Sequence, residues 1–157
     1  VTFVVAGQSH FEGRGSYRLP RLPNLRMVGH VHAQKKRILL KKAWLLINLS
    51  VHEGVAISFL EALFCATPIV SLVDPGGLVS SYGLFAGPAP GDGLTGLPKL
   101  VESISTLLSN RSLRYDLGKQ GRAHVMATHN EQKFVQGFVT LVNQFSQTGS
   151  EYSPRLS

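Results

Sequence analysis

Three consecutive apolar segments in the middle of the chain constrain its fold most strongly. Trp44–Ser50 and Ile69–Val73 have the length and composition of buried strands, and Val55–Ala66 between them has the length of a helix. This helix is apolar nearly all round, which is typical of a buried helix rather than a surface helix. A buried helix between two strands predicts a β-α-β unit with parallel strands.

Similar segments on both sides extend this pattern. The other expected elements are strands over 1–6, 25–31 and, at an edge, 83–86, with helices over 33–42, from about 78, and over about 97–109, 111–128 and 130–146. We therefore expect an α/β domain with a Rossmann-like, doubly wound parallel sheet and a C-terminal helical cluster. The domain should cover 1–146 with an incomplete N-terminal edge, because Val1 already lies within an apolar run. Residues 147–157 should form a flexible tail.

Composition and charge narrow the class of protein. With 157 residues and 43% hydrophobic content, the chain should form one domain with a substantial core. A single cysteine excludes an intrachain disulfide and favours the reducing cytoplasm. No apolar run approaches the roughly 20 residues that a membrane-spanning helix needs. The net charge of +7 favours an anionic partner, which could be a nucleotide diphosphate, an anionic membrane surface or a nucleic acid.

The cationic segment between two of the strands is the main candidate for a surface partner. Lys35, Lys36, Arg37, Lys41 and Lys42 surround three apolar residues and could touch anionic lipid head groups at the inner membrane face. A solvated helix face is the favoured interpretation, because ten residues are few for a membrane helix. Aromatic residues are not interleaved with these cations, so we expect no nucleic-acid partner. The six histidines form no metal-ligand array, and we expect no metal.

Two glutamates mark the most informative turn. Glu53 and Glu61 have seven residues between them and bracket the turn from the central strand to the buried helix. Ligands of open α/β sheets bind at such turns. Glu61 is the only charged residue between Gly54 and Ala66, and a carboxylate within an apolar helix is costly unless it is hydrogen-bonded. A ribose diol, with two donors for two carboxylate oxygens, would satisfy it.

The backbone around these glutamates suits a phosphate. Gly54 allows a ligand to approach the chain closely, and the free N–H groups of Val55, Ala56 and Ile57 begin the helix, where a diphosphate would be favoured. Gly7 ends the first strand on the same expected edge. Gly7 is not followed by a Gly-x-Gly-x-x-Gly pattern, so a nicotinamide or flavin cofactor of the usual type is disfavoured and none is expected.

The order of these features resembles the C-terminal, donor-binding half of a GT-B glycosyltransferase, most closely the retaining family 4 (glycosyl transferases group 1). That family has two glutamates around a Glu-Gly-Phe-Gly turn, which here reads Glu53-Gly-Val-Ala and continues to Glu61. The run over 61–70, EALFCATPIV, resembles the family stretch EAMACGTPVV, and NLRMVGHV over 24–31 resembles NVRFLGHV. The segment over 107–122 resembles the closing helices of the family.

The resemblance implies roles for individual residues. Glu61 would bind the ribose hydroxyls, and Glu53 would act at the reacting centre beside the transferred sugar. The remaining donor contacts implied by position are Gly7, Gly29, Val31, Gly54, Val55, Ala56 and Ile57, of which Gly29 and Val31 would line the base pocket. No enzyme nucleophile is implied, so the protein would mainly orient the reactants and stabilise charge.

The implied activity is a hexosyl transfer from a nucleotide-diphosphate sugar, such as a UDP or GDP sugar, to a glycan or lipid-type acceptor. Val55-Ala56 replaces the Phe-Gly of the family turn, and neither the family's basic diphosphate ligands nor its N-terminal acceptor domain is present in this chain. We therefore expect the isolated chain to transfer nothing. A non-catalytic nucleotide-sugar-binding module and a flavodoxin-like interaction domain stay open as alternatives, and an epimerase of the same fold is a more remote one.

Overall fold

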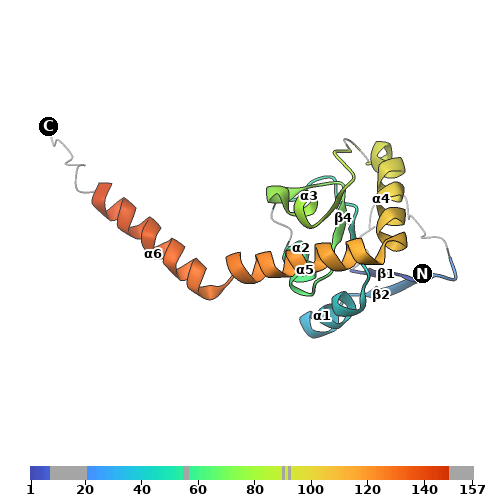
Figure 1. The fold of residues 1–157 in the computed structure, drawn as a ribbon, viewed down its shortest axis with the longest axis horizontal. Helices are drawn as coiled ribbons and strands as arrows, with labels where there is room; N and C mark the ends of the chain where they lie inside the picture. The colour runs from blue at the N-terminus through green and yellow to red at the C-terminus, as the bar shows by residue number, and fades with distance from the viewer. Residues whose placement is uncertain (8–20, 55–56, 90, 92, 149–157) are drawn as a thin grey trace.

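The chain folds into an α/β domain from which one long helix extends (Figure 1). The computed structural model describes residues 1–7, 21–54, 57–89, 91 and 93–148. In these residues the strands are β1 (Phe3–Ala6), β2 (Leu25–Gly29), β3 (Leu46–Asn48), β4 (Ile69–Ser71) and β5 (Gly83–Phe85). The α-helices are α1 (Ala33–Lys42), α2 (Ile57–Phe64), α3 (Leu78–Tyr82), α4 (Leu97–Ser109), α5 (Arg111–Thr128) and α6 (Glu131–Thr148).

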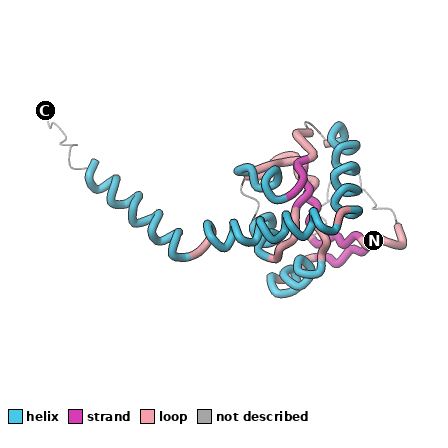
Figure 2. Tube along the Cα trace, viewed as in Figure 1, coloured by secondary structure: helices cyan, strands magenta, loops and turns pink. Residues whose placement is uncertain are grey.

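All strand pairs in the described part of the chain are parallel, as the alternation of strands and helices predicts. β1 pairs with β2, and β3, β4 and β5 form a second sheet in that order, with β5 at its edge (Figure 2). The predicted α/β class, with parallel strands and C-terminal helices, is confirmed. The strands are divided between two small sheets, and Val4 and Val5 of β1 are 45% and 38% exposed.

The core lies on both faces of the three-stranded sheet. Ile69 and Val70 are neighbours on β4, so their side chains point to opposite faces. Ile69 belongs to a cluster with residues of α2, α3 and α5, whereas Val70 belongs to a cluster with Leu100 and Leu107 of α4. Both β4 residues are fully buried. Helices therefore cover both faces, which is the doubly wound arrangement.

Helix α2 is buried on one face rather than all round. Phe59, Ala62 and Leu63 have no exposed surface, but Ile57 is 69% exposed and Phe64 is 37% exposed. The prediction of a fully buried helix is therefore wrong for Ile57 and Phe64, because the elements that pack against α2, which are α1, α5 and β4, leave these two side chains uncovered. Burial of the inner face is what the apolar composition dictates.

Glycines in α5 allow this helix to pack very close to α2. A Cβ atom added at Gly118 would lie 2.1 Å from the carbonyl oxygen of Ala66, just beyond the end of α2. One added at Gly121 would lie 2.6 Å from Cδ2 of Leu63. Because α5 carries no side chain at these two points, it sits directly against α2 and the loop that follows it.

The sequence predicts Trp44 as the first residue of a buried strand, and this prediction is wrong. Strand β3 begins at Leu46, and Trp44 is 55% exposed in the connection that precedes it. The guanidinium of Arg114 lies 4.6 Å from the centre of the indole ring and donates a 2.8 Å hydrogen bond to the carbonyl oxygen of Leu108. A cation–π contact on the surface therefore replaces burial.

Helix α6 extends away from the domain (Figure 1). Its side chains from Glu131 to Ser146 are exposed, and the rings of Phe134 and Phe138 stack with centroids 6.4 Å apart. Of the helices described, none has both the length and the apolar character needed to cross a membrane. Most of the predicted tail, over 149–157, lies outside the described residues.

Candidate functional site

Gly7 and Gly29 meet where the two N-terminal strands end. The N–H of Gly7 donates a 2.9 Å hydrogen bond to the carbonyl oxygen of Gly29. Both residues have positive φ angles, 146° and 64°, which residues other than glycine rarely adopt. A Cβ atom added at either glycine would meet nothing within 4 Å. The structure thus places these two predicted residues together at an open edge, with the half-buried Val31 two residues further along the chain.

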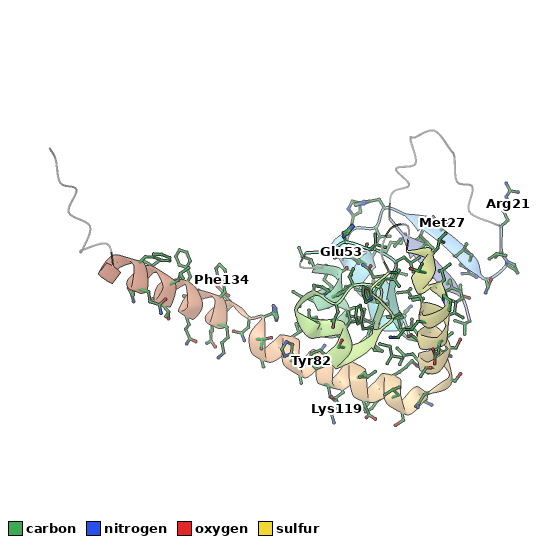
Figure 3. All side chains as sticks on the ribbon, turned by 90° about the horizontal axis from the view of Figure 1, so that it is seen from above. Arg21, Met27, Glu53, Tyr82, Lys119 and Phe134 are labelled. Atoms are coloured by element: carbon green, nitrogen blue, oxygen red, sulfur yellow. The ribbon has the colours of Figure 1, made fainter. Side chains whose placement is uncertain are left out.

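The turn between β3 and α2 is also open. The N–H of Ser50 donates a 2.8 Å hydrogen bond to Oδ1 of Asn48, which bends the chain directly after β3. Glu53 and Gly54 are exposed, and a Cβ atom added at Gly54 would meet nothing within 4 Å. In the view of Figure 3, Glu53 lies on the opposite side of the domain from Lys119 of α5. A carboxylate at this position is accessible to a ligand.

Two of the predicted phosphate contacts cannot be placed. Val55 and Ala56 lie outside the described residues, so the predicted role of their N–H groups stays a prediction. Ile57, the third, is the first residue of α2 and is exposed. The sequence placed Ile57 in the first turn of a helix expected to begin at Val55, and its contact with the phosphate likewise stays a prediction.

Glu61 lies one turn into α2 and forms an ion pair that the sequence analysis missed. Nζ of Lys36, on α1, lies 2.7 Å from Oε1 of Glu61, and the two side chains are 39% and 33% exposed. Oε2 of Glu61 is buried and has no hydrogen-bond partner among the described residues. The predicted conflict between this carboxylate and its apolar helix is therefore only half resolved: one oxygen is paired with a cation, and the other lacks a donor.

A cavity opens between α1, α2 and α5 beside this ion pair. Its volume is about 390 Å³, within the range of ligand pockets, and most of its lining is apolar. The lining residues are Ala33, Lys36, Arg37, Leu40, Leu60, Glu61, Phe64, Cys65, Val125 and His129. Glu61 is the one predicted site residue among them. Glu53 and the predicted glycines lie outside this lining.

Lys36 has a contact that its local sequence does not indicate. Its pattern with four neighbouring cations predicts a solvated or lipid-facing helix surface. The structure turns its ammonium group toward α2, while Lys35 beside it is exposed. The two members of the ion pair are 25 residues apart in the sequence, so no local spacing could have revealed the contact. In the described part of the chain, no three His, Cys, Asp or Glu side chains are grouped as metal ligands.

Comparison with protein families gives one match. The sequence profile described as "Glycosyl transferases group 1" matches residues 1–124, which include β1 to β5 and most of α5. Comparisons with curated proteins and with solved structures give no match. The matched region contains Glu53, Glu61 and both parallel sheets. The match supports a function in glycosyl transfer. The chain belongs to the group 1 glycosyl transferases.

Proposed function

We propose that this chain is the donor-binding half of a retaining glycosyltransferase, which moves a hexose from a nucleotide-diphosphate sugar to a glycan or lipid-type acceptor. The observation that supports this most directly is the state of Glu61. Its carboxylate lines an apolar cavity and has a buried oxygen without a donor. A hydrogen-bond donor from a ligand would remove the cost of that unsatisfied atom.

A ribose supplies such donors, because its 2′ and 3′ hydroxyls form a vicinal diol that matches the spacing of two carboxylate oxygens. The apolar side chains around Glu61 would exclude water from this contact and strengthen it. In this proposal Glu61 fixes the nucleoside part of the donor. The diphosphate would then extend toward the start of α2, where helix N–H groups favour negative charge.

Glu53 is the proposed residue at the reacting centre. It is exposed and lies before α2, so it can contact a sugar attached to a diphosphate at the start of that helix. Its carboxylate would hold the sugar hydroxyls and stabilise the positive charge that develops on the ring as the bond to the diphosphate breaks. The chain would work with an acceptor-binding half, and the acceptor hydroxyl would attack on the face that the diphosphate leaves.

Saturation-transfer NMR tests the donor site. The full-length protein would be measured with UDP, GDP and ADP sugars, as the wild type and as Glu61→Ala. Glu102→Ala is a matched control, because Glu102 is an exposed glutamate on α4, away from the cavity. We expect one nucleotide class to bind the wild type and the control and to lose most of its signal with Glu61→Ala. Equal signals from all three proteins would contradict the proposed role of Glu61.

The stereochemical outcome needs a separate experiment. With the donor class known, ¹H NMR of the first-formed product gives the configuration of the new glycosidic bond. Retention is expected, and an inverted product would contradict the assignment to the retaining class. A protein that binds the donor but transfers no sugar to any acceptor would instead be a non-catalytic binding module.

A further inference from the structure

The ion pair between Lys36 and Glu61 occupies the carboxylate that the proposed function assigns to the ligand. A vicinal diol needs both carboxylate oxygens to form two hydrogen bonds. In this structure Oε1 is 2.7 Å from the Lys36 ammonium, and Oε2 is closed to solvent. The diol contact therefore requires Lys36 to release Oε1 and the carboxylate to turn so that Oε2 faces the cavity.

Lys36 is exposed enough to exchange its contact with Glu61 for water. Its side chain is 39% exposed, so the ammonium group can leave Oε1 and be solvated by water. Glu61 belongs to a helix whose inner face is fixed in the core by Phe59, Ala62 and Leu63. Of the two partners, the lysine can withdraw at the lower cost.

The other groups near the ion pair do not replace Lys36 in this contact. Arg37 and His129 also line the cavity, but the ion pair that the structure shows for Glu61 is with Lys36. Cys65 lies on the same side, with its Sγ 4.0 Å from the backbone carbonyl oxygen of Arg37. Among the described residues, Lys36 is therefore the cation that a diol would have to displace from Glu61.

We propose that Lys36 competes with the donor's ribose diol for Glu61 and so sets how strongly the site selects a ribonucleotide over its deoxy counterparts. This inference rests on the proposed function, because it assumes that Glu61 binds the diol. Without Lys36, the free protein would hold an unpaired, partly buried carboxylate that gains more from a diol. Exposed and half-exposed ion pairs are weak, so the gain in diol affinity should be about two- to fivefold.

A ratio of dissociation constants isolates the diol from the phosphates. The full-length protein would be titrated by calorimetry with UDP, GDP and ADP and with the 2′,3′-dideoxy form of each. The ratio of the dideoxy to the ribonucleotide dissociation constant measures diol selectivity. Any attraction between Lys36 and the diphosphate affects both ligands and cancels in this ratio.

The variants are Lys36→Met and Lys36→Gln, with Lys35→Met as a control. Lys35→Met makes the same change in charge at the adjacent, exposed position of α1. Both Lys36 variants should raise the diol selectivity about two- to fivefold, while Lys35→Met should leave it at the wild-type value. An unchanged or lower selectivity in folded Lys36 variants, as judged by their thermal unfolding, would overturn the proposal.

Glu61→Ala separates failure of this inference from failure of the proposed function. If Glu61→Ala brings the selectivity close to one while the Lys36 variants match the wild type, Glu61 binds the diol and Lys36 does not compete for it. If the wild type itself shows no diol selectivity, and the Lys36 and Glu61 variants show none either, both proposals fail.

Discussion

The hydroxyl of Thr67 donates a 2.7 Å hydrogen bond to the carbonyl oxygen of Leu40, across 27 residues of sequence. Thr67 is 2% exposed and Leu40 is 8% exposed, so water cannot replace this bond. It joins the last turn of α1 to the loop between α2 and β4. Because α1 carries Lys36 and α2 carries Glu61, the bond helps to hold the two sides of the cavity in position.

Thr67→Val should destabilise the domain by about 1 kcal/mol, because the shape is kept but the buried carbonyl of Leu40 loses one of its two donors and keeps only the N–H of Ala43 at 3.1 Å. Urea denaturation followed by circular dichroism measures this change. Thr140→Val is the matched control. Its hydroxyl also donates to a backbone carbonyl, that of Gln136 at 2.8 Å, but on the exposed surface of α6. The control should change stability by less than about 0.5 kcal/mol, and equal effects at both positions would contradict the buried role of Thr67.

Gly118→Ala should destabilise the domain by about 3 kcal/mol, because the added methyl group would overlap the backbone carbonyl of Ala66. The same change at Gly137 in α6 meets nothing within 4 Å and should instead stabilise by about 0.5–1 kcal/mol through helix propensity. Thermal or urea denaturation of the two variants distinguishes packing from propensity. A stabilised Gly118→Ala protein would show that α5 does not approach α2 this closely.

Ala66→Gly should stabilise the domain by about 0.5 kcal/mol. Ala66 has a φ of 59°, a left-handed conformation that costs residues with a Cβ about 1–2 kcal/mol. Glycine removes this cost. It also gives the unfolded chain more conformational freedom, which lowers the free energy of unfolding by up to about 1 kcal/mol. The resembling family stretch has glycine at this position. A lower urea midpoint for Ala66→Gly would contradict a strained Ala66.

The sequence predicted those elements whose signals are local. The bounds of α1 match the prediction, because the stretch between the turn at Gly29 and the strand that begins at Leu46 carries its own helical pattern. β5 was expected at a sheet edge and lies there. Trp44 was misplaced because its apolar character continues into β3, while a cation on α5, 70 residues away, accounts for its exposed position.

The candidate site was predictable only in part. Glu61 could be selected from the sequence because it is the single charge in an apolar helix, and the structure places it in a cavity. Its pairing with Lys36 depends on how α1 packs against α2, which no periodicity encodes. The division of the strands into two sheets is likewise a tertiary property, because each strand has the same local signal whichever partner it finds.

Steady-state kinetics of the full-length protein, with the donor selected by the binding experiment, tests the central claim most directly. The variants are Glu53→Gln and Glu61→Ala, with Glu102→Gln as the control. We predict that Glu53→Gln lowers kcat by about 10²–10³-fold with little change in the donor KM. Glu61→Ala should raise the donor KM by about tenfold or more, and Glu102→Gln should match the wild type. Wild-type kcat/KM in both the Glu53 and the Glu61 variants would contradict the assignment of a donor site to this turn and helix.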